Sequence, residues 1–257
     1  MKRALLAVGL VAALGAGCGD DGEASGGASG DTRPQLTVSA ASSMTEALTA
    51  CAQDYPDAEV KLQFAGSDEL AAQIRQGVEP DVYAAANTRL PDELAAEGLL
   101  SKPVVFATNE FVLAVPEGSD IASLEDLTAQ DVKIAIGSES VPIGEYTRES
   151  LAKLPPAQEK AILANVRSNE PDVKGIAGKL TQGAADAGFV YVTDVQATDG
   201  ALEAIKLPAM LEPDATYGAG VVKGAREPKT AATFVDGLVD GECADALQAA
   251  GFGEPPG

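Results

Sequence analysis

The stretch that decides the fold is QLTVSAASSMTEALTACAQ, residues 35–53. Its first part, Gln35–Ala40, is a short β-like run. Small and polar residues follow, and Met44–Gln53 is the alanine-rich sequence of a helix. A strand that leads directly into a helix is the building unit of α/β proteins, so this stretch predicts that fold class for the chain.

The same order of strand, loop and helix recurs along the chain, without internal repeats. Further strands are expected at residues 60–64, 81–85, 132–136, 188–192 and 201–207. Helices are expected at residues 68–76, 91–97, 144–154, 173–181, 228–239 and 243–250. This alternation predicts an α/β architecture with parallel sheets.

Two apolar runs, residues 109–115 and 217–222, are long enough to cross from one lobe of the protein to another. They divide the chain into lobe I, residues 34–113 and 217–257, and lobe II, residues 114–216. A chain of 257 residues is long enough for two modest lobes around a cleft. Because the chain crosses twice, the two crossing strands are expected to form a hinge.

Residues 1–18 have the features of a lipoprotein-type signal peptide. Met1–Arg3 supplies the positive start, and Ala4–Leu14 is an apolar run too short to span a bilayer. The spacing that leads into Cys18 resembles the lipoprotein processing box, in which the cysteine becomes the acylated first residue. The box usually has leucine three residues before the cysteine, where this chain has Gly15. Lipidation of Cys18 is the prediction, and a soluble secreted form is the alternative.

Residues 19–33 are mostly glycine, serine, alanine and acidic residues, which cannot build a core. They predict a flexible tether, with the folded part beginning near Pro34. Together with a lipid at Cys18, the tether predicts a protein held at the outer face of the cell membrane. Processing without lipidation would leave the protein in the periplasm.

The composition argues against several classes of function. The formal net charge is -21 with a pI near 4.2, and the sequence has no basic stripe, so a nucleic-acid partner is not expected. The chain has no histidine and no G-x-S-x-G or S-x-x-K motif, so a serine nucleophile would lack an activating base. We therefore expect no enzyme activity and no cofactor. Without histidine or metal-ligand cysteine spacing, no zinc site is expected either.

If Cys18 carries lipid, Cys51 and Cys243 remain in an exported, disulfide-permissive compartment. A disulfide between them would tie an early helix to the last helix and would require both to lie in one lobe. The alternative is a pair of buried free thiols.

Four loops share one design, in which a strand ends, a few small or polar residues follow, and a helix begins. They are Ala40–Glu46, Phe64–Leu70, Ser140–Gly144 and Pro171–Gly175. The N-terminus of a helix leaves free N–H groups and a partial positive charge. Each loop taken alone is equally typical of an ordinary helix cap.

Particular residues in these loops suit a bound anion. Ser43 with Glu46 fits the S-x-x-E capping box. Gly66 lets the backbone approach a ligand closely, and Ser67 stands at the helix start. Pro142 stiffens a loop whose next N–H groups point the same way, and Pro171 with Asp172 opens a helix at Val173.

In open α/β sheets, ligands bind at the carboxyl ends of the strands. Two facing lobes would bring four such ends together around one site. Hydrogen bonds to a charged group contribute roughly 1.5 to 3 kcal/mol each, so six or seven give on the order of 10 to 20 kcal/mol. Association costs roughly 4 to 15 kcal/mol. The difference is compatible with micromolar to nanomolar binding of an oxyanion without any buried lysine or arginine.

Five segments, in this order and spacing, resemble the bacterial molybdate-binding proteins of ABC transporters. They are Ala40–Ser43, Phe64–Ser67, Pro80–Tyr83, Val141–Gly144 and Gly188–Tyr191. The resemblance covers nearly everything from residue 35 to residue 252. It implies a type II periplasmic-binding-protein fold, with two α/β lobes, a hinge of two crossing strands and a ligand cleft between the lobes.

The resemblance also implies the residues that hold the ligand, a tetrahedral molybdate or tungstate. Ser43 and Ser67 would each offer a hydroxyl and a backbone N–H, Ile143 and Val173 would offer backbone N–H groups, and Tyr191 would offer its phenol. Ser42 is the alternative to Ser43. The family often has alanine at the position of Ile143, and this change keeps the N–H donor.

The family implies a monomer that delivers its anion to an ABC permease and its ATPase. Binding of another oxyanion, sulfate or phosphate, is the alternative function. Phosphate carries a proton at neutral pH and is favoured by a carboxylate acceptor. Asp68 must therefore point away from the ligand if the molybdate interpretation of the second loop is right.

Overall fold

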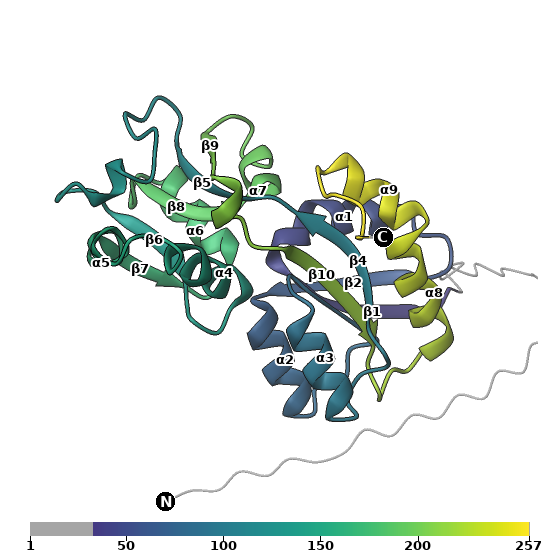
Figure 1. Ribbon diagram of the computed structural model, residues 1–257. Coiled ribbons are helices and arrows are strands. Elements are labelled where there is room, and N and C mark those ends of the chain that lie inside the picture. The colour runs from purple at the N-terminus through teal and green to yellow at the C-terminus, as the bar shows by residue number, and fades with distance from the viewer. Residues whose placement is uncertain (1–32, 257) are drawn as a thin grey trace, which may run out of the picture. The chain divides into compact units, whose positions relative to one another are not determined.

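A computed structural model describes residues 33–256 of the chain. The predicted signal peptide, the lipid site Cys18 and the tether up to Thr32 lie outside the described residues. The described part contains two five-stranded sheets, each covered by helices (Figure 1). We call the sheet with the order β2-β1-β3-β10-β4 and its helices lobe I, and the sheet with the order β7-β6-β8-β5-β9 and its helices lobe II.

Lobe I is built from both ends of the described segment. Its strands are β1 (Gln35–Ala41), β2 (Glu59–Ala65), β3 (Val82–Ala85), β4 (Val104–Asn109) and β10 (Ala215–Val221). Its helices are the 3-10 turn η1 (Ser42–Met44), α1 (Thr45–Gln53), α2 (Ser67–Arg75), α3 (Arg89–Ala96), α8 (Pro228–Val239) and α9 (Glu242–Ala249).

Lobe II is built from the middle of the chain. Its strands are β5 (Phe111–Pro116), β6 (Ile134–Gly137), β7 (Val166–Glu170), β8 (Ala187–Tyr191) and β9 (Leu202–Lys206). Its helices are η2 (Asp126–Thr128), α4 (Pro142–Leu151), α5 (Pro156–Ala164), α6 (Val173–Thr181), α7 (Val192–Gln196) and η3 (Ala209–Leu211). The expected fold class, two α/β lobes, is confirmed.

The prediction of wholly parallel sheets is wrong, because each sheet contains one strand that runs against its neighbours. In lobe I this strand is β10, and in lobe II it is β5. Both arrive from the other lobe without a crossover helix, so they start at the end where the neighbouring strands finish. Phe111 at the start of β5, for example, pairs with Tyr191 at the end of β8.

The same geometry fixes where the chain changes lobes. β4 ends in lobe I at Asn109, β5 starts in lobe II at Phe111, and the return strand β10 starts at Ala215. The boundaries predicted at residues 113/114 and 216/217 fall inside β5 and β10. We therefore propose that the lobes divide at Glu110 and just before Ala215.

Buried side chains on both faces of the central strands explain why helices cover both sides of each sheet. All residues of β3, β6 and β8 are buried, as expected for strands inside covered sheets. In β3, Val82 and Ala84 join one apolar cluster, whereas Tyr83 and Ala85 join another that contains residues of α2 and α3. This alternation places α2 and α3 on one face of the sheet, opposite α1 and α8 (Figure 1).

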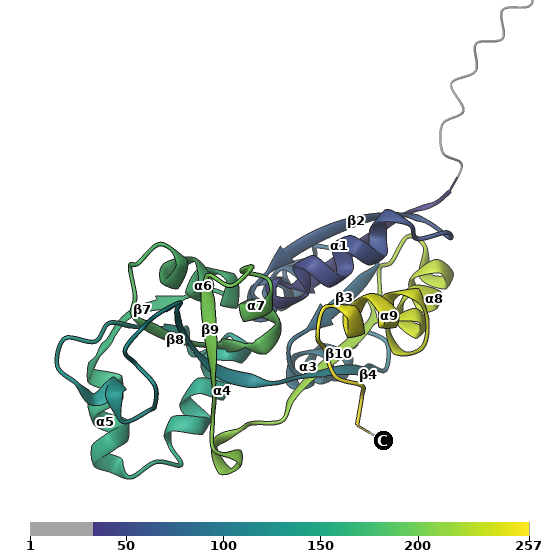
Figure 2. The ribbon, with the colours of Figure 1, turned by 90° about the horizontal axis from the view of Figure 1, so that it is seen from above.

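A disulfide joins Cys51 of α1 to Cys243 of α9, with a Cα–Cα distance of 5.0 Å. Helix α9 packs against both α1 and α8, so the first and last helices of lobe I lie together (Figure 2). The predicted pairing is confirmed, and the alternative of two free thiols is wrong.

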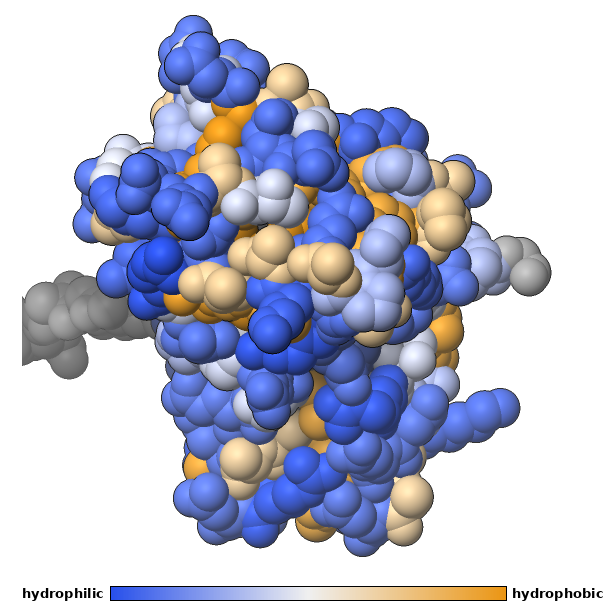
Figure 3. Space-filling model, turned by 60° about the vertical axis from the view of Figure 1, so that its left-hand side comes forward, coloured by the Kyte–Doolittle hydropathy of each residue, from blue (hydrophilic) through white to orange (hydrophobic). Residues whose placement is uncertain are grey.

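The surface of the described residues is largely polar. The face shown in Figure 3 is predominantly hydrophilic, with apolar residues interspersed. Among the described residues, the large apolar side chains that are exposed are few and scattered: Val78, Val105, Leu163, Met210 and Val239. Within residues 33–256, no helix has the length and apolar character needed to cross a bilayer.

Candidate functional site

A small cavity of about 10 Å³ lies where the two lobes meet. Its volume is far below the roughly 300–1,000 Å³ of pockets for drug-sized ligands, so only a small ligand would suit it. All five residues predicted from the sequence line it, together with eight others: Ser43, Ser67, Ile143, Val173 and Tyr191, with Ala41, Ser42, Ala65, Gly66, Ala86, Val141, Pro142 and Asp172.

Four helix starts surround this cavity: those of η1, α2, α4 and α6. The cap residues of the first three, Ala41, Gly66 and Val141, make no side-chain cap hydrogen bond, so the N–H groups of those first turns have no capping acceptor. Asp172 caps α6 by accepting from the Gly175 N–H at 3.0 Å, which leaves the Val173 N–H uncapped. The cavity is thus lined by backbone donors and partial positive charge.

The predicted capping box of Ser43 and Glu46 is wrong. Helix α1 follows the 3-10 turn, its cap residue is Met44, and no side chain caps it. The Ser43 hydroxyl is instead hydrogen bonded to the Tyr217 hydroxyl at 3.0 Å. Glu46 pairs with Lys174 of lobe II at 2.8 Å, because a charged partner binds a carboxylate more strongly than a backbone N–H does.

The side-chain hydroxyls at the cavity are set up to donate. The Ser67 Oγ accepts from the Ala86 N–H at 3.1 Å, which leaves the Ser67 proton available to another acceptor. The Tyr191 hydroxyl is buried and has no hydrogen-bond partner among the described residues. An unpaired buried hydroxyl costs about 1–3 kcal/mol, so an acceptor in the cavity would relieve this cost. Burial also raises the pKa of Tyr191, which keeps the phenol protonated.

Two further residues belong to the site, Ser42, which the sequence offered as an alternative, and Tyr217, which it did not indicate. Ser42 lines the same cavity as Ser43, so both serines of the first loop reach it. Sequence reasoning missed Tyr217, which bonds to Ser43 from the return strand β10. Its segment carried only the pattern of a crossing strand, and no local motif identified its hydroxyl.

Among the residues that the structure describes, no lysine or arginine lines the cavity. Lys174 follows the lining residue Val173, but its ammonium group is paired with Glu46 at 2.8 Å and with Asp194 at 3.2 Å. Burial raises the pKa of Asp194 to about 6, although Lys174 opposes this. For Lys174, burial is the largest single effect and by itself would lower the pKa. The negative charges of Asp194 and Glu46 together exceed it, so the pKa of Lys174 is raised. Asp194 also accepts from the Tyr191 N–H at 3.3 Å, so the pair ties α6 to α7.

Asp68 is not among the residues that line the cavity, as the interpretation of the second loop requires. Its Oδ2 accepts from the Ser140 hydroxyl, whereas its Oδ1 is buried with no hydrogen-bond partner among the described residues. Because Ser140 belongs to lobe II, this hydrogen bond also joins the two lobes.

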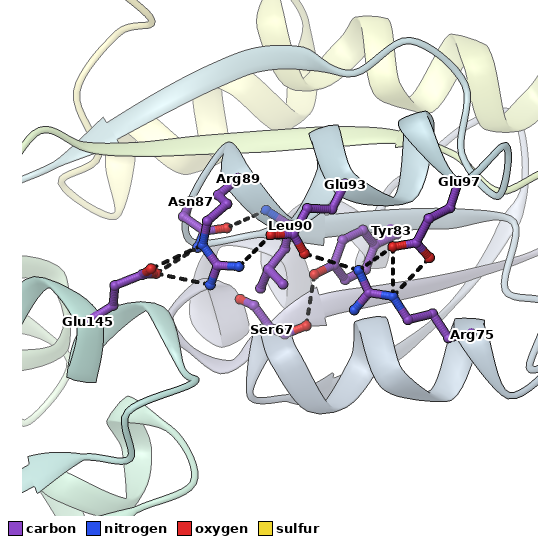
Figure 4. A network of polar contacts seen from close by, with 9 residues as sticks. All are labelled: Ser67, Arg75, Tyr83, Asn87, Arg89, Leu90, Glu93, Glu97 and Glu145. Atoms are coloured by element: carbon purple, nitrogen blue, oxygen red, sulfur yellow. Dashed lines mark hydrogen bonds and ion pairs between the residues drawn. The ribbon is translucent and has the colours of Figure 1, made fainter.

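A further contact between the lobes lies on their surface (Figure 4). Arg89 of α3 holds the carboxylate of Glu145 of α4 with two hydrogen bonds of 3.0 and 3.1 Å. Arg89 also donates to Glu93, which with Glu97 binds Arg75. These side chains are partly exposed, so solvent screening keeps the contribution of each pair to stability small. They orient α3 toward lobe II more than they stabilise the fold.

Within residues 33–256, no group of three or more His, Cys, Asp or Glu side chains is placed to hold a metal ion. Besides the Asp172 side chain, the polar groups at the cavity are hydroxyls and backbone N–H groups, which can donate hydrogen bonds to oxygen atoms of a ligand.

Comparison with known proteins gives a consistent family. Residues 36–253 match the model of the bacterial extracellular solute-binding proteins. The chain is 33% identical over 264 residues to the molybdate-binding protein ModA of Mycobacterium tuberculosis, covering 99% of this chain and 97% of that protein.

Two solved structures share the fold. The periplasmic molybdate-binding protein of Azotobacter vinelandii matches with a TM-score of 0.77 at 19% identity, covering 86% of this chain and 100% of that one. The sulfate-binding protein SubI of Mycobacterium tuberculosis matches with a TM-score of 0.74 at 13% identity, covering 86% of both chains. The same fold therefore accompanies two different oxyanions.

Proposed function

Because the chain belongs to the bacterial extracellular solute-binding proteins, we propose that it captures molybdate or tungstate outside the cytoplasm for an ABC importer. The importer's permease would receive the anion, and its ATPase would drive transport. Family membership makes the protein a solute-binding protein rather than an enzyme. The anchor would be a lipid on Cys18, and the protein would act as a monomer.

The observation that carries the proposal is the cavity lined by Ser43, Ser67, Ile143, Val173 and Tyr191. Backbone N–H groups from four helix starts and the hydroxyls of four residues can donate to a ligand there, and among residues 33–256 no lysine or arginine lines it. A tetrahedral oxyanion offers acceptors in all directions, so neutral donors that converge on one small space suit it.

Sulfate and phosphate are the alternative ligands. Hydrogen phosphate must donate a proton, and a site for it needs an acceptor such as a carboxylate. Asp172 lines the cavity and uses one carboxylate oxygen to accept from the Gly175 N–H. Asp68 does not line the cavity, and its Oδ2 accepts from the Ser140 hydroxyl. Sulfate carries no proton at neutral pH and needs no such acceptor.

Isothermal titration of the purified chain with molybdate, tungstate, sulfate and phosphate tests the ligand. Heat is the suitable signal because the chain has no tryptophan. We expect submicromolar binding of molybdate and tungstate, and no measurable heat of binding for sulfate and phosphate. Tight binding of sulfate or phosphate instead would keep the transport role and overturn the ligand. Silence toward all four anions would reject an oxyanion site.

Gly66→Ala is expected to weaken molybdate binding roughly 5- to 150-fold, the equivalent of 1–3 kcal/mol of overpacking. The backbone of Gly66 (φ -60°, ψ 139°) suits alanine. A Cβ there would lie 2.5 Å from the Pro171 carbonyl oxygen and 3.5 Å from Val141, both in lobe II, and 2.9 Å from the Asp68 Oδ1 of its own lobe. The methyl group therefore opposes the closed arrangement of the lobes.

The matched control for this variant is Gly237→Ala in α8, where an added Cβ would meet nothing within 4 Å. It should bind molybdate as the wild type does. Titration of both variants measures the effect, and equal affinity of Gly66→Ala and wild type would mean that the lobes need not approach this closely.

A further inference from the structure

We propose that Tyr217 and Asn109 are positioning residues that fix the Ser43 hydroxyl as a hydrogen-bond donor to the bound anion. The inference rests on the proposed function, since it concerns how the same cavity holds its ligand. It follows from a chain of hydrogen bonds whose direction can be assigned one step at a time.

The chain begins at a backbone group that can only donate. The Glu110 N–H lies 2.9 Å from the Oδ1 of Asn109, so this end of the amide must be its oxygen. The other end is therefore the NH₂ group. It donates to the Thr193 hydroxyl at 2.9 Å and, over a longer distance of 3.4 Å, to the Tyr217 hydroxyl.

The next step is the proton of Tyr217. The Tyr217 side chain is completely buried, and burial raises the pKa of its phenol, so the hydroxyl stays protonated. Its hydrogen bonds among the described residues are with Asn109 and Ser43, and its side chain also interacts with that of Tyr191, which adds to the effect of burial in raising the pKa of Tyr191. An amide NH₂ cannot accept, so of the two hydrogen-bond partners only the Ser43 Oγ, at 3.0 Å, can take the Tyr217 proton.

Ser43 thereby accepts one hydrogen bond and keeps its own proton to donate. Because Ser43 lines the cavity, the proton can be directed at an anion there. The Ser67 hydroxyl also keeps its proton to donate, because its Oγ accepts from the Ala86 N–H. The opposite orientation, with Ser43 donating to Tyr217, would turn a Ser43 lone pair toward the anion and repel it.

Tyr217→Phe removes only the hydroxyl and keeps the ring that packs against Tyr191 and Phe252. Ser43 would then sample both orientations, so we expect about tenfold weaker molybdate binding, the equivalent of one hydrogen bond. The decisive measurement is a double-mutant cycle with Ser43→Ala, read by isothermal titration. In the Ser43→Ala background, Tyr217→Phe should change the affinity less than about twofold, because the group it orients is gone.

Tyr55→Phe is the matched control, since Tyr55 is also buried but packs against Phe234 of α8, away from the cavity. It should leave molybdate binding unchanged. If Tyr217→Phe does not fold, as judged by urea unfolding, Asn109→Ala takes its place in the cycle. We expect a loss in the same direction that again disappears in the Ser43→Ala background.

Equal losses in both backgrounds, or wild-type affinity of Tyr217→Phe, would overturn the positioning role while leaving the proposed function intact. A wild-type chain that does not bind molybdate would instead reject the proposed function, and this inference with it.

Discussion

Ser67→Asp should abolish molybdate binding. Ser67 is almost fully buried at the start of α2 and lines the cavity, so an aspartate there would place a carboxylate against the anion. Two like unit charges about 4 Å apart repel by about 4 kcal/mol at an effective dielectric constant of 20, which is about a thousandfold in affinity. A dianion would be repelled more strongly still.

The same substitution should leave the fold intact, because a negative side chain in the first turn of a helix is favourable. Titration with molybdate measures the loss, and urea unfolding checks the fold. Ser119→Asp is the control: Ser119 sits in a turn after β5, and its hydroxyl accepts from the Ile121 N–H, a role that aspartate can take over. Unchanged affinity of Ser67→Asp would remove Ser67 from the binding site.

Removing the disulfide by Cys51→Ala with Cys243→Ala should lower the free energy of unfolding by about 2–5 kcal/mol. The bond joins residues 192 positions apart, so it constrains the unfolded chain strongly. Both cysteines are buried, and alanine fills part of the same space. Urea unfolding of the variant and the wild type measures the difference.

The two single variants serve as controls, because each breaks the same bond. They should lose about as much stability as the double variant, rather than half of it. Alkylation followed by intact-mass measurement should add two more labels after reduction than before. A double variant that unfolds at the wild-type urea concentration would show that the bond does not stabilise the folded state.

The parts of the fold that the sequence predicted are those with a strong local pattern. The bounds of α6 and α8 agree with prediction to the residue, because a proline or aspartate opens each helix and apolar residues repeat along it. The predicted site loops meet at one cavity for the same reason, since each loop carries its own small and polar residues at a helix start.

Elements with a weak apolar signal were missed. β7 is an edge strand of sequence VRSNE with no fully buried residue, so it has no run of apolar side chains. In α5, only Ile162 is buried, which leaves no apolar face to recognise. β4 was missed as well, since the predicted crossing run begins only at Asn109, its last residue, and only Phe106 and Ala107 in β4 are buried.

Contacts between residues far apart in the chain could not be predicted. Ser43 and Tyr217 are 174 positions apart, and nothing near either residue specifies the other. The direction of β5 and β10 was missed for a related reason. A change of lobe reverses the strand relative to its new neighbours, but it leaves the apolar pattern of the strand itself unchanged.

The disulfide between α1 and α9 has a consequence for a protein exposed to proteases. The whole of lobe II and both crossings lie in the segment between Cys51 and Cys243. A single cut anywhere in that segment would leave two fragments that remain one covalent molecule. Lobe I would keep both ends of its chain joined through α1 and α9, so a nicked protein would come apart only after a reductant reached the bond.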